Sequence, residues 1–332
     1  MPLVSVIIPT YNRLPRLKQV LAALERQDYP RDQFNVVVIS DGSTDGTDDY
    51  VQRLVTPLDL VFAPQANQGP AAARNYGIRC ASGEYILFID DDIIPAPGLL
   101  TEHMRLHATE EQLVVLGPML TPTDFTLSPW VAWEQAMLYK QYTAMQLGRW
   151  APTARQFYTG NTSLARKHLL AVGGFDERFR RAEDVELAYR LDKLDLRFIF
   201  NAQAIGYHYA ERSFHSWLGT PYAYGRNDVV FAREHQSPVL KVMRNEFRQR
   251  NRLTQALVWI CLDHPALSRR VEDLLKQVAD RLTRLGSERM TQFCYSAIFN
   301  LRYYQGVADE LGGYRHLFSK QVAQDHKPMS LH

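Results

Sequence analysis

Three consecutive carboxylates, Asp90-Asp91-Asp92, directly follow the apolar run 85–89. Neighbouring carboxylates repel one another by about 1 kcal/mol per pair in water, and by more where solvent is partly excluded. A cation would relieve this repulsion, and an all-oxygen ligand set without His or Cys is typical of Mg²⁺ or Mn²⁺ held together with substrate phosphates. The triplet is therefore a candidate metal and phosphate site, with a solvated acidic turn as the alternative.

A second pair of carboxylates, Glu183 and Asp184, stands at the start of a predicted helix. Acidic residues in a first turn often only interact favourably with the helix dipole. One of them could instead act as a general base that accepts a proton from a reacting hydroxyl group. His208 is a candidate auxiliary metal ligand, with a hydrogen-bonded core histidine as the alternative.

Other polar residues follow apolar runs or begin a helix. The segment Pro9-Thr10-Tyr11-Asn12-Arg13 offers a hydroxyl, an amide and an aromatic ring on which a nucleobase could stack. Asp41 is expected to accept hydrogen bonds from a ligand, whereas Asp45 is expected to cap the next helix. Arg74, near the start of an alanine-rich helix, could bind a phosphate or form a structural ion pair.

An alternation of two patterns must position these residues. Continuous apolar runs, typical of strands buried on both faces, are separated by segments with apolar residues at helical spacing. The predicted strands are 3–8, 35–39, 60–63, 85–89 and 113–116, and the predicted helices are 14–24, 47–55, 69–81 and 97–107. This order predicts a single, mainly parallel sheet with helices on both faces, in which ligands bind beyond the carboxyl ends of the strands.

The alternation stops after residue 118. Ser128-Pro129 predicts the start of a helix that extends to about Met145. Farther on, 159–165, 197–200 and 204–209 are predicted to be extended, 182–194 helical, and the chain beyond Ser213 mainly helical. We therefore expect an α/β domain over 1–212 and a helical extension over 213–332 that packs on it.

Composition excludes several classes of protein. The 332 residues hold 38 Lys and Arg against 36 Asp and Glu, a net charge of +2 that argues against nucleic acid as a partner. Three widely spaced cysteines suit a reducing compartment and form neither a disulfide framework nor a zinc site. A signal peptide and an apolar run of membrane-spanning length are both missing. We expect a cytoplasmic protein. The alternative is a cytoplasmic protein that also contacts the inner face of the membrane peripherally.

One basic segment bears on membrane contact. Residues 239–253 contain five basic residues and one acidic residue, and Val239, Val242, Met243 and Phe247 can share one helical face. Such a helix could lie on an anionic membrane surface, where a lipid-linked acceptor would be found. The favoured interpretation is a helix packed on the core with a solvated basic face.

Taken together and in this order, the motifs resemble those of the family 2 glycosyltransferases, which have the GT-A fold. The matching segments are 4–12, 41–45, 67–75, 90–92, 160–163 and 183–184, and the resemblance covers about residues 2–210. It implies a nucleotide-sugar donor, favouring UDP, a saccharide or lipid-linked acceptor, Mg²⁺ or Mn²⁺, and inversion at the transferred sugar. The Gln-x-x-Arg-Trp motif of processive synthases is missing from the sequence, which favours transfer of single sugars.

The resemblance also implies a role for each matching residue. Asp184 would be the general base, with Glu183 beside it. The residues implied at the nucleotide are Pro9, Thr10, Tyr11, Asn12, Asp41, Arg74, Asp90 and Asp91. The implied metal ligands are Asp92 and Asp90 of the DxD element, with His208 as an auxiliary, and Gly160-Asn161 would lie near the acceptor. Many relatives have two aspartates where this chain has Ser40-Asp41, which weakens the implied base contact of Asp41.

Two other functions stay open. One is a non-catalytic module that binds a nucleotide sugar. The other is a sugar-phosphate nucleotidyltransferase, although residues 9–13 lack the Gly-rich loop usual in that class. A dehydrogenase is not indicated, because no G-x-G-x-x-G follows the first strand. No pattern in the sequence indicates an oligomeric state.

Overall fold

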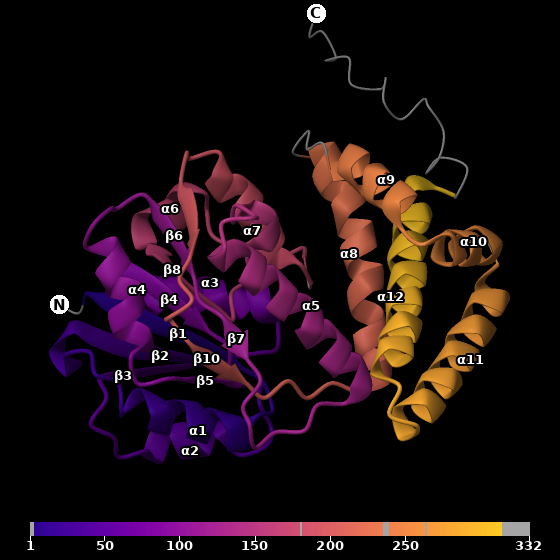
Figure 1. Ribbon diagram of the computed structural model, residues 1–332. Helices are drawn as coiled ribbons and strands as arrows, with labels where there is room; N and C mark the ends of the chain where they lie inside the picture. The colour runs from indigo at the N-terminus through magenta and orange to yellow at the C-terminus, as the bar shows by residue number, and fades with distance from the viewer. Residues whose placement is uncertain (1–2, 180, 235–238, 263, 314–332) are drawn as a thin grey trace, which may run out of the picture. The chain divides into compact units, whose positions relative to one another are not determined.

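A computed structural model describes residues 3–179, 181–234, 239–262 and 264–313 (Figure 1). The chain divides into two compact units. One contains Met1–Thr126 with Gln135–Ala210, and the other contains Leu127–Glu134 with Glu211–His332. Helix α5 (Pro129–Gln146) contributes residues to both.

The first unit is built around a seven-stranded sheet in the order β3-β2-β1-β4-β8-β6-β9. The strands are β1 (Val4–Thr10), β2 (Phe34–Asp41), β3 (Leu60–Gln65), β4 (Tyr85–Ile89), β6 (Leu113–Leu116), β8 (Asn161–Ala165) and β9 (Arg197–Phe200). Only β8 runs antiparallel to its neighbours, β4 and β6. The sheet is therefore mainly parallel, as predicted, and β1, β2 and β4 end at the same edge.

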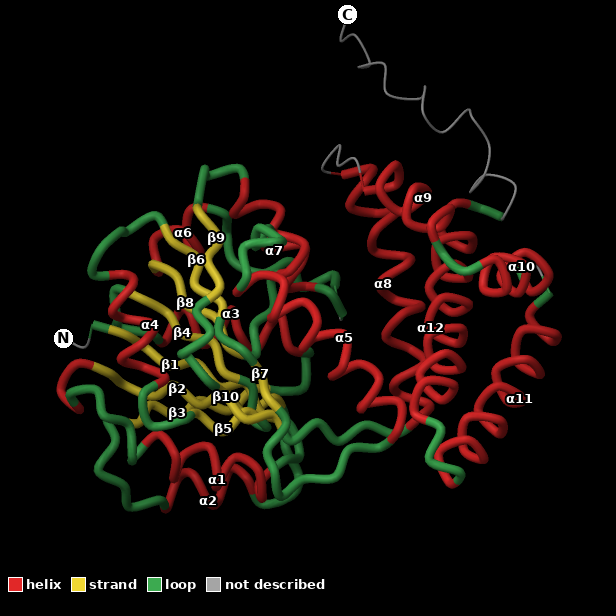
Figure 2. Tube along the Cα trace, viewed as in Figure 1, coloured by secondary structure: helices red, strands yellow, loops and turns green. Residues whose placement is uncertain are grey.

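Helices cover both faces of this sheet (Figure 2). The alternation of side chains along β4 explains why: Ile86 and Phe88 pack on one face, and Leu87 and Ile89 on the other. The first face is covered by α3 (Pro70–Cys80), α6 (Arg166–Ala171) and α7 (Glu183–Asp192), and the second by α1 (Leu14–Leu24), α2 (Thr47–Arg53) and α4 (Leu99–His107). Up to residue 116, every predicted strand and helix is present, with bounds that differ by at most two residues.

A second, three-stranded sheet was not predicted. Its order is β5-β10-β7, formed by β5 (Ile93–Pro95), β10 (Gly206–His208) and β7 (Met119–Leu120). The segment 204–209 was expected to be extended, and within it β10 pairs with β5 and β7 rather than with the central sheet. Strands of two or three residues carry too little periodicity to be recognised before their partners are known.

The second unit is helical, as expected for the chain beyond Ser213. It contains α8 (Phe214–Glu234), α9 (Val239–Gln249), α10 (Arg252–Cys261), α11 (Pro265–Arg284) and α12 (Glu288–Leu311). Trp217 and Tyr295 are fully buried in one of its cores. Within the described residues, no helix combines the length and the apolar character needed to cross a membrane.

Helix α9 carries the basic segment discussed above. Met243 and Phe247 are buried in a cluster with Val229 and Tyr304, whereas Lys241 on α9 is exposed. The favoured interpretation, a core-packed helix with a solvated basic face, is confirmed. Val242, expected on the same apolar face, is 39% exposed, so the core takes up only part of that face.

Two glycines allow α8 and α12 to pack closely. A Cβ atom on Gly225 would lie 2.0 Å from the carbonyl oxygen of Tyr303, and one on Gly306 would lie 2.1 Å from that of Tyr222. Backbone atoms cannot move aside as a flexible side chain can. The packing of these two helices therefore requires both glycines.

We expect Gly306→Ala to destabilise the protein by about 2 kcal/mol, because overpacking costs about 1–3 kcal/mol and outweighs the roughly 1 kcal/mol gain in helix propensity. Urea unfolding followed by tryptophan fluorescence measures this, since Trp130, Trp133, Trp217 and Trp259 belong to the second unit. Gly98→Ala is the control, because its Cβ would meet the nearest atom at an ordinary 3.5 Å. Equal midpoints for the two variants would contradict the packing argument.

Candidate active site

The candidate site lies at the edge where β1, β2 and β4 end. Because β1 and β4 are parallel neighbours, Thr10 and the acidic triplet come together at this edge. The Thr10 hydroxyl donates a hydrogen bond of 2.7 Å to Asp91 Oδ2. Arg13 contacts Asp92, and its Nη1 is 3.6 Å from Asp91 Oδ1. No role was predicted for Arg13 from the sequence. Its position just after the first strand, whose neighbour in the sheet ends at the triplet, could have indicated an ion pair with these aspartates.

The two buried aspartates of the triplet differ in their electrostatics. Burial and the neighbouring charge of Asp92 raise the pKa of Asp91 to about 7. Burial also favours a raised pKa for Asp92, but contacts with His208 and Arg13 prevail and lower that pKa below its usual range. The site therefore keeps a full negative charge on Asp92 at neutral pH.

The same residues form the donor set available to a metal ion. His208 Nε2 is 3.6 Å from Asp92 Oδ1, and both side chains are largely buried. The carboxylate donors suit Mg²⁺ or Mn²⁺, and His208 would add one nitrogen ligand. No group of three or more candidate ligands converges within the described ranges. The donor set fits an ion that draws its remaining ligands from phosphates and water.

A buried guanidinium joins the third aspartate to helix α7. Arg74 Nη2 lies 2.7 Å from Asp90 Oδ1, and its Nη1 lies 2.8 Å from Glu183 Oε1. Burial favours a lowered pKa for Arg74, but the charges of Asp90 and Glu183 prevail and raise it. Of the two roles considered for Arg74, the structure displays the ion pair. Gly160 also lies here, since a Cβ on it would be 3.2 Å from Asp90 Oδ2.

Asp184 sits in the first turn of α7, next to this ion pair. Ala182 precedes the helix with φ 57°, a left-handed conformation that turns the chain into α7. Asp184 Oδ1 accepts a hydrogen bond from the backbone N–H of Val185. Burial and the adjacent charge of Glu183 raise the pKa of Asp184 to about 7, despite the opposing charge of Arg74. A carboxyl group with this pKa can accept a proton at neutral pH.

The remaining predicted nucleotide residues border the edge in different ways. Tyr11 is 50% exposed and available for stacking. Asn12 has φ 54°, and its Oδ1 accepts a hydrogen bond from the backbone N–H of Thr44. Asp41 is buried, and its carboxylate accepts bonds from the backbone N–H groups of Gln68 and Gly69. Asn12 and Asp41 thus fix the loops around the site.

Asp45 has the capping role expected of it. Its Oδ1 accepts hydrogen bonds from the backbone N–H and the hydroxyl of Thr47, the first residue of α2. Its Oδ2 accepts a bond from the backbone N–H of Leu14, the first residue of α1. One carboxylate therefore ties the starts of two helices together.

The side chain of Asn161 is held within the fold. Asn161 is fully buried, and its Nδ2 donates hydrogen bonds to the carbonyl oxygens of Pro118 and Ala204. Its Oδ1 is 2.9 Å from Nε2 of buried His103. This side chain therefore joins segments of the fold, and the position of Gly160-Asn161 near an acceptor stays a prediction.

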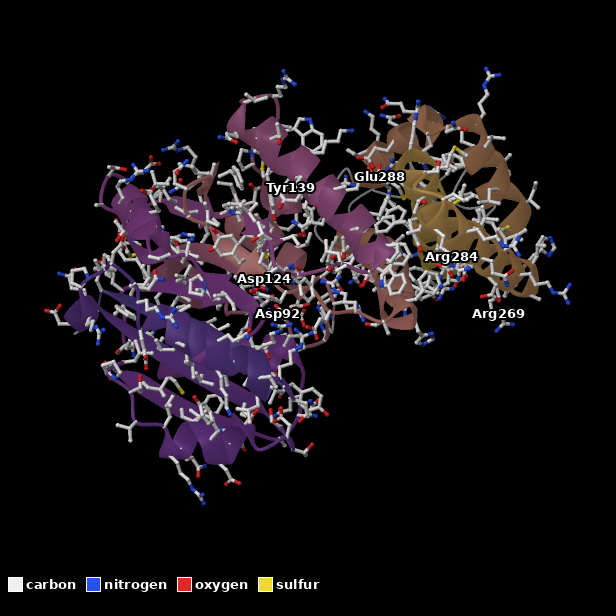
Figure 3. The ribbon with its side chains drawn as sticks, turned by 60° about the horizontal axis from the view of Figure 1, so that its bottom comes forward. Asp92, Asp124, Tyr139, Arg269, Arg284 and Glu288 are labelled. Atoms are coloured by element: carbon white, nitrogen blue, oxygen red, sulfur yellow. The ribbon has the colours of Figure 1, made fainter. Side chains whose placement is uncertain are left out.

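A further contact fixes the chain around Asp92. The backbone N–H of Tyr209 donates a hydrogen bond to the carbonyl oxygen of Asp92, and its hydroxyl donates one to Asp124. The Arg16 guanidinium lies 4.3 Å from the centre of the Tyr209 ring. Asp92 and Asp124, labelled in Figure 3, are thus linked through Tyr209. No pattern in the sequence indicates this link, because Tyr209 and Asp124 are 85 residues apart.

The fold and the site together define an α/β protein with an acidic edge at the ends of its parallel strands and a carboxyl group of raised pKa beside it. The family model described as "Glycosyl transferase family 2" matches residues 5–171, half of the chain. The chain therefore belongs to family 2 of the glycosyltransferases.

Among its relatives, validoxylamine A glucosyltransferase of Streptomyces hygroscopicus subsp. jinggangensis is 36% identical over 216 residues, covering 57% of this chain and 51% of the relative. The chain thus spans about half the length of such curated relatives.

Two solved structures show that the fold is GT-A. One is mannosyltransferase PcManGT from Pyrobaculum calidifontis in complex with GDP-Man and Mn²⁺, with a TM-score of 0.62 and 23% identity over 92% of this chain and 87% of that one. The other is residues 1–349 of S. aureus TarS in complex with UDP-GlcNAc, with a TM-score of 0.58 and 20% identity over 95% of this chain and 93% of that one.

We expect Arg74→Met to destabilise the protein by about 3 kcal/mol at pH 7.5, because it leaves Asp90 and Glu183 without their buried counter-ion. Urea unfolding at this pH measures the loss. The control is Arg79→Met, an exposed arginine on the same helix. A stability equal to that of the wild type at pH 7.5 would show that the ion pair contributes nothing.

Proposed function

We propose that this chain is an inverting glycosyltransferase that moves a single sugar from a nucleotide-diphosphate sugar, with UDP favoured, to an acceptor hydroxyl group. The observation that carries the proposal is the placement of Asp184. Its carboxyl group has a raised pKa and adjoins the Arg74 ion pair, which leads directly to the acidic edge. A base and a diphosphate site in one connected network are what glycosyl transfer requires.

The donor would lie along the edge formed by β1, β2 and β4. Tyr11 would stack on the base, and Thr10 and Asp91 would border the ribose. The names of similar proteins support a nucleotide-sugar donor: the TarS structure contains UDP-GlcNAc, and PcManGT contains GDP-Man. UDP is preferred here on the resemblance of the motifs, and GDP is the competing nucleotide.

A divalent ion would be held by Asp92 and His208, with Asp90 or Asp91 beside them. When bound with the donor, Mg²⁺ or Mn²⁺ would neutralise the charge of the diphosphate as it leaves. Arg13 already contacts Asp92, so it would share this carboxylate with the ion and stay close to the phosphates. The Mn²⁺ in the PcManGT complex supports divalent metal use.

The proposed chemical step uses the two carboxylates of α7 differently. Arg74 pairs with Glu183, which leaves Asp184 as the carboxylate that can take a proton. Asp184 removes the proton of the acceptor hydroxyl while that oxygen bonds to the anomeric carbon. The bond from this carbon to the diphosphate oxygen breaks on the opposite face, so the configuration inverts. Positioned base catalysis of this kind contributes about 10²–10⁴-fold.

Calorimetric titration with UDP, with and without Mn²⁺, tests the donor site, with GDP and dTDP as comparators. We expect UDP to bind at least tenfold more tightly with Mn²⁺, and Asp92→Ala to remove this enhancement. Asp59→Ala, at an exposed aspartate, is the control. Unchanged metal dependence in Asp92→Ala would reject the metal role. Preference for GDP or dTDP would revise the donor, and failure of every nucleotide to bind would overturn the proposed function.

We expect Asp184→Asn to lower transfer by about 10²–10⁴-fold while leaving the UDP affinity unchanged, because only the base is lost. The control is Asp192→Asn, an exposed aspartate on the same helix. Sugar transfer at nearly the wild-type rate by Asp184→Asn would show that Asp184 is not the base. Nucleotide binding without transfer or donor hydrolysis by the wild type would favour the non-catalytic module, and release of pyrophosphate would favour a nucleotidyltransferase.

The raised pKa of Asp184 has two further consequences within this test. For the wild type, kcat/KM should fall about tenfold per pH unit below about pH 7, because the base must be deprotonated. The fold should also lose stability as the pH rises from the ordinary pKa of 3.8 toward 7, because the ionised form is disfavoured in the native state. Asp184→Asn escapes this loss and should be at least as stable as the wild type at pH 8.

A further inference from the structure

Helix α11 buries one side and leaves a second apolar stripe in solvent. Ser268, Glu272 and Ala279 are buried on the side that packs within the second unit. The apolar stripe consists of Leu267, Leu274, Val278 and Leu285, with exposed fractions of 38%, 59%, 36% and 79%. Their spacing of seven, four and seven residues places them on one face of the helix. Exposed apolar side chains gathered along one helix face commonly mark a surface that contacts another molecule.

Arginines border this stripe. At 3.6 residues per turn, Arg270, Arg281 and Arg284 fall along one flank of it, and all three side chains are exposed. Arg269 and Arg284 are labelled on this helix in Figure 3. The helix as a whole is basic, with five Lys and Arg against three Asp and Glu over residues 265–284. The surface is therefore apolar along its centre and basic along its side.

A second copy of the chain is a poor occupant for this surface. The stripe has the three-and-four spacing of a coiled-coil seam, but Arg281 occupies one position of that seam. Pairing two α11 helices, in either direction, would set the arginines of one copy near those of the other. The repulsion favours a partner that is negatively charged.

The length of the stripe identifies the kind of negatively charged partner. Leu267 and Leu285 are 18 residues apart, which corresponds to about 27 Å along the helix. A lipid interface offers an apolar layer along this whole length and anionic headgroups beside it. We propose that α11 lies in the plane of an anionic membrane surface, with the apolar stripe in the headgroup–acyl boundary and the arginines on the phosphates. This proposal does not rest on the proposed transfer activity, because it concerns binding alone.

Flotation of the full chain with phospholipid vesicles tests the proposal. We expect the wild type to float with vesicles of 30% phosphatidylglycerol in phosphatidylcholine, to stay behind with pure phosphatidylcholine, and to bind less at 500 mM NaCl. Leu274→Gln/Leu285→Gln should weaken binding at least tenfold. Arg270→Gln/Arg281→Gln/Arg284→Gln should abolish the preference for anionic vesicles. All these side chains are exposed, so circular dichroism and urea midpoints should match those of the wild type.

Two control variants make the same chemical changes elsewhere. Val55→Gln/Leu147→Gln removes two exposed apolar side chains of the first unit, and Arg26→Gln/Arg53→Gln/Arg149→Gln removes three exposed arginines there. Both should float like the wild type. Failure of the wild type to float with anionic vesicles, or equal losses in the controls and the α11 variants, would overturn the proposal. So would a wild-type dimer, seen by light scattering, that Leu274→Gln/Leu285→Gln converts to a monomer without changing flotation.

Discussion

The buried guanidinium of Arg74 is the contact on which the geometry of the site depends. A charge buried among apolar residues is costly unless hydrogen-bonded counter-ions surround it. Arg74 meets this requirement with Asp90, just past the end of β4, and with Glu183, at the start of α7. Elements far apart in the sequence are thereby held at one edge of the sheet. The ion pair fixes the first turn of α7, which carries Asp184, while Leu187 and Leu191 anchor the rest of the helix in the core.

The rest of the acidic edge is held in the same manner. Strands buried on both faces can place charged groups only at their ends, so the triplet gathers where β4 stops. Asp90 turns toward Arg74, whereas Asp91 and Asp92 turn toward Arg13. Gly160 leaves room for the carboxylate of Asp90, because a Cβ atom at this position would lie 3.2 Å from Asp90 Oδ2. One short run of identical residues thus serves two regions of the site.

Local patterns predicted the elements of the first unit but not all their partners. Long apolar runs and helical spacing are visible in the sequence, so the strands and helices up to residue 116 were predicted to within two residues. The resemblance implied that Asn161 lies near an acceptor, but nothing in the sequence indicates that its amide bonds to the carbonyl groups of Pro118 and Ala204. For α9, the pattern revealed an apolar face but not that Phe247 packs against Tyr304.

The distinction between Glu183 and Asp184 has the same origin. The two neighbours have the same chemistry, and the sequence could not say which would act as a base without a resemblance to known proteins. In the structure, Arg74 pairs with Glu183, whereas burial and the adjacent charge of Glu183 raise the pKa of Asp184. A pair of carboxylates with different environments is a common way to assign different roles to identical groups. The ion pair that holds the fold together is therefore also the physical reason to propose Asp184, rather than its neighbour, as the base.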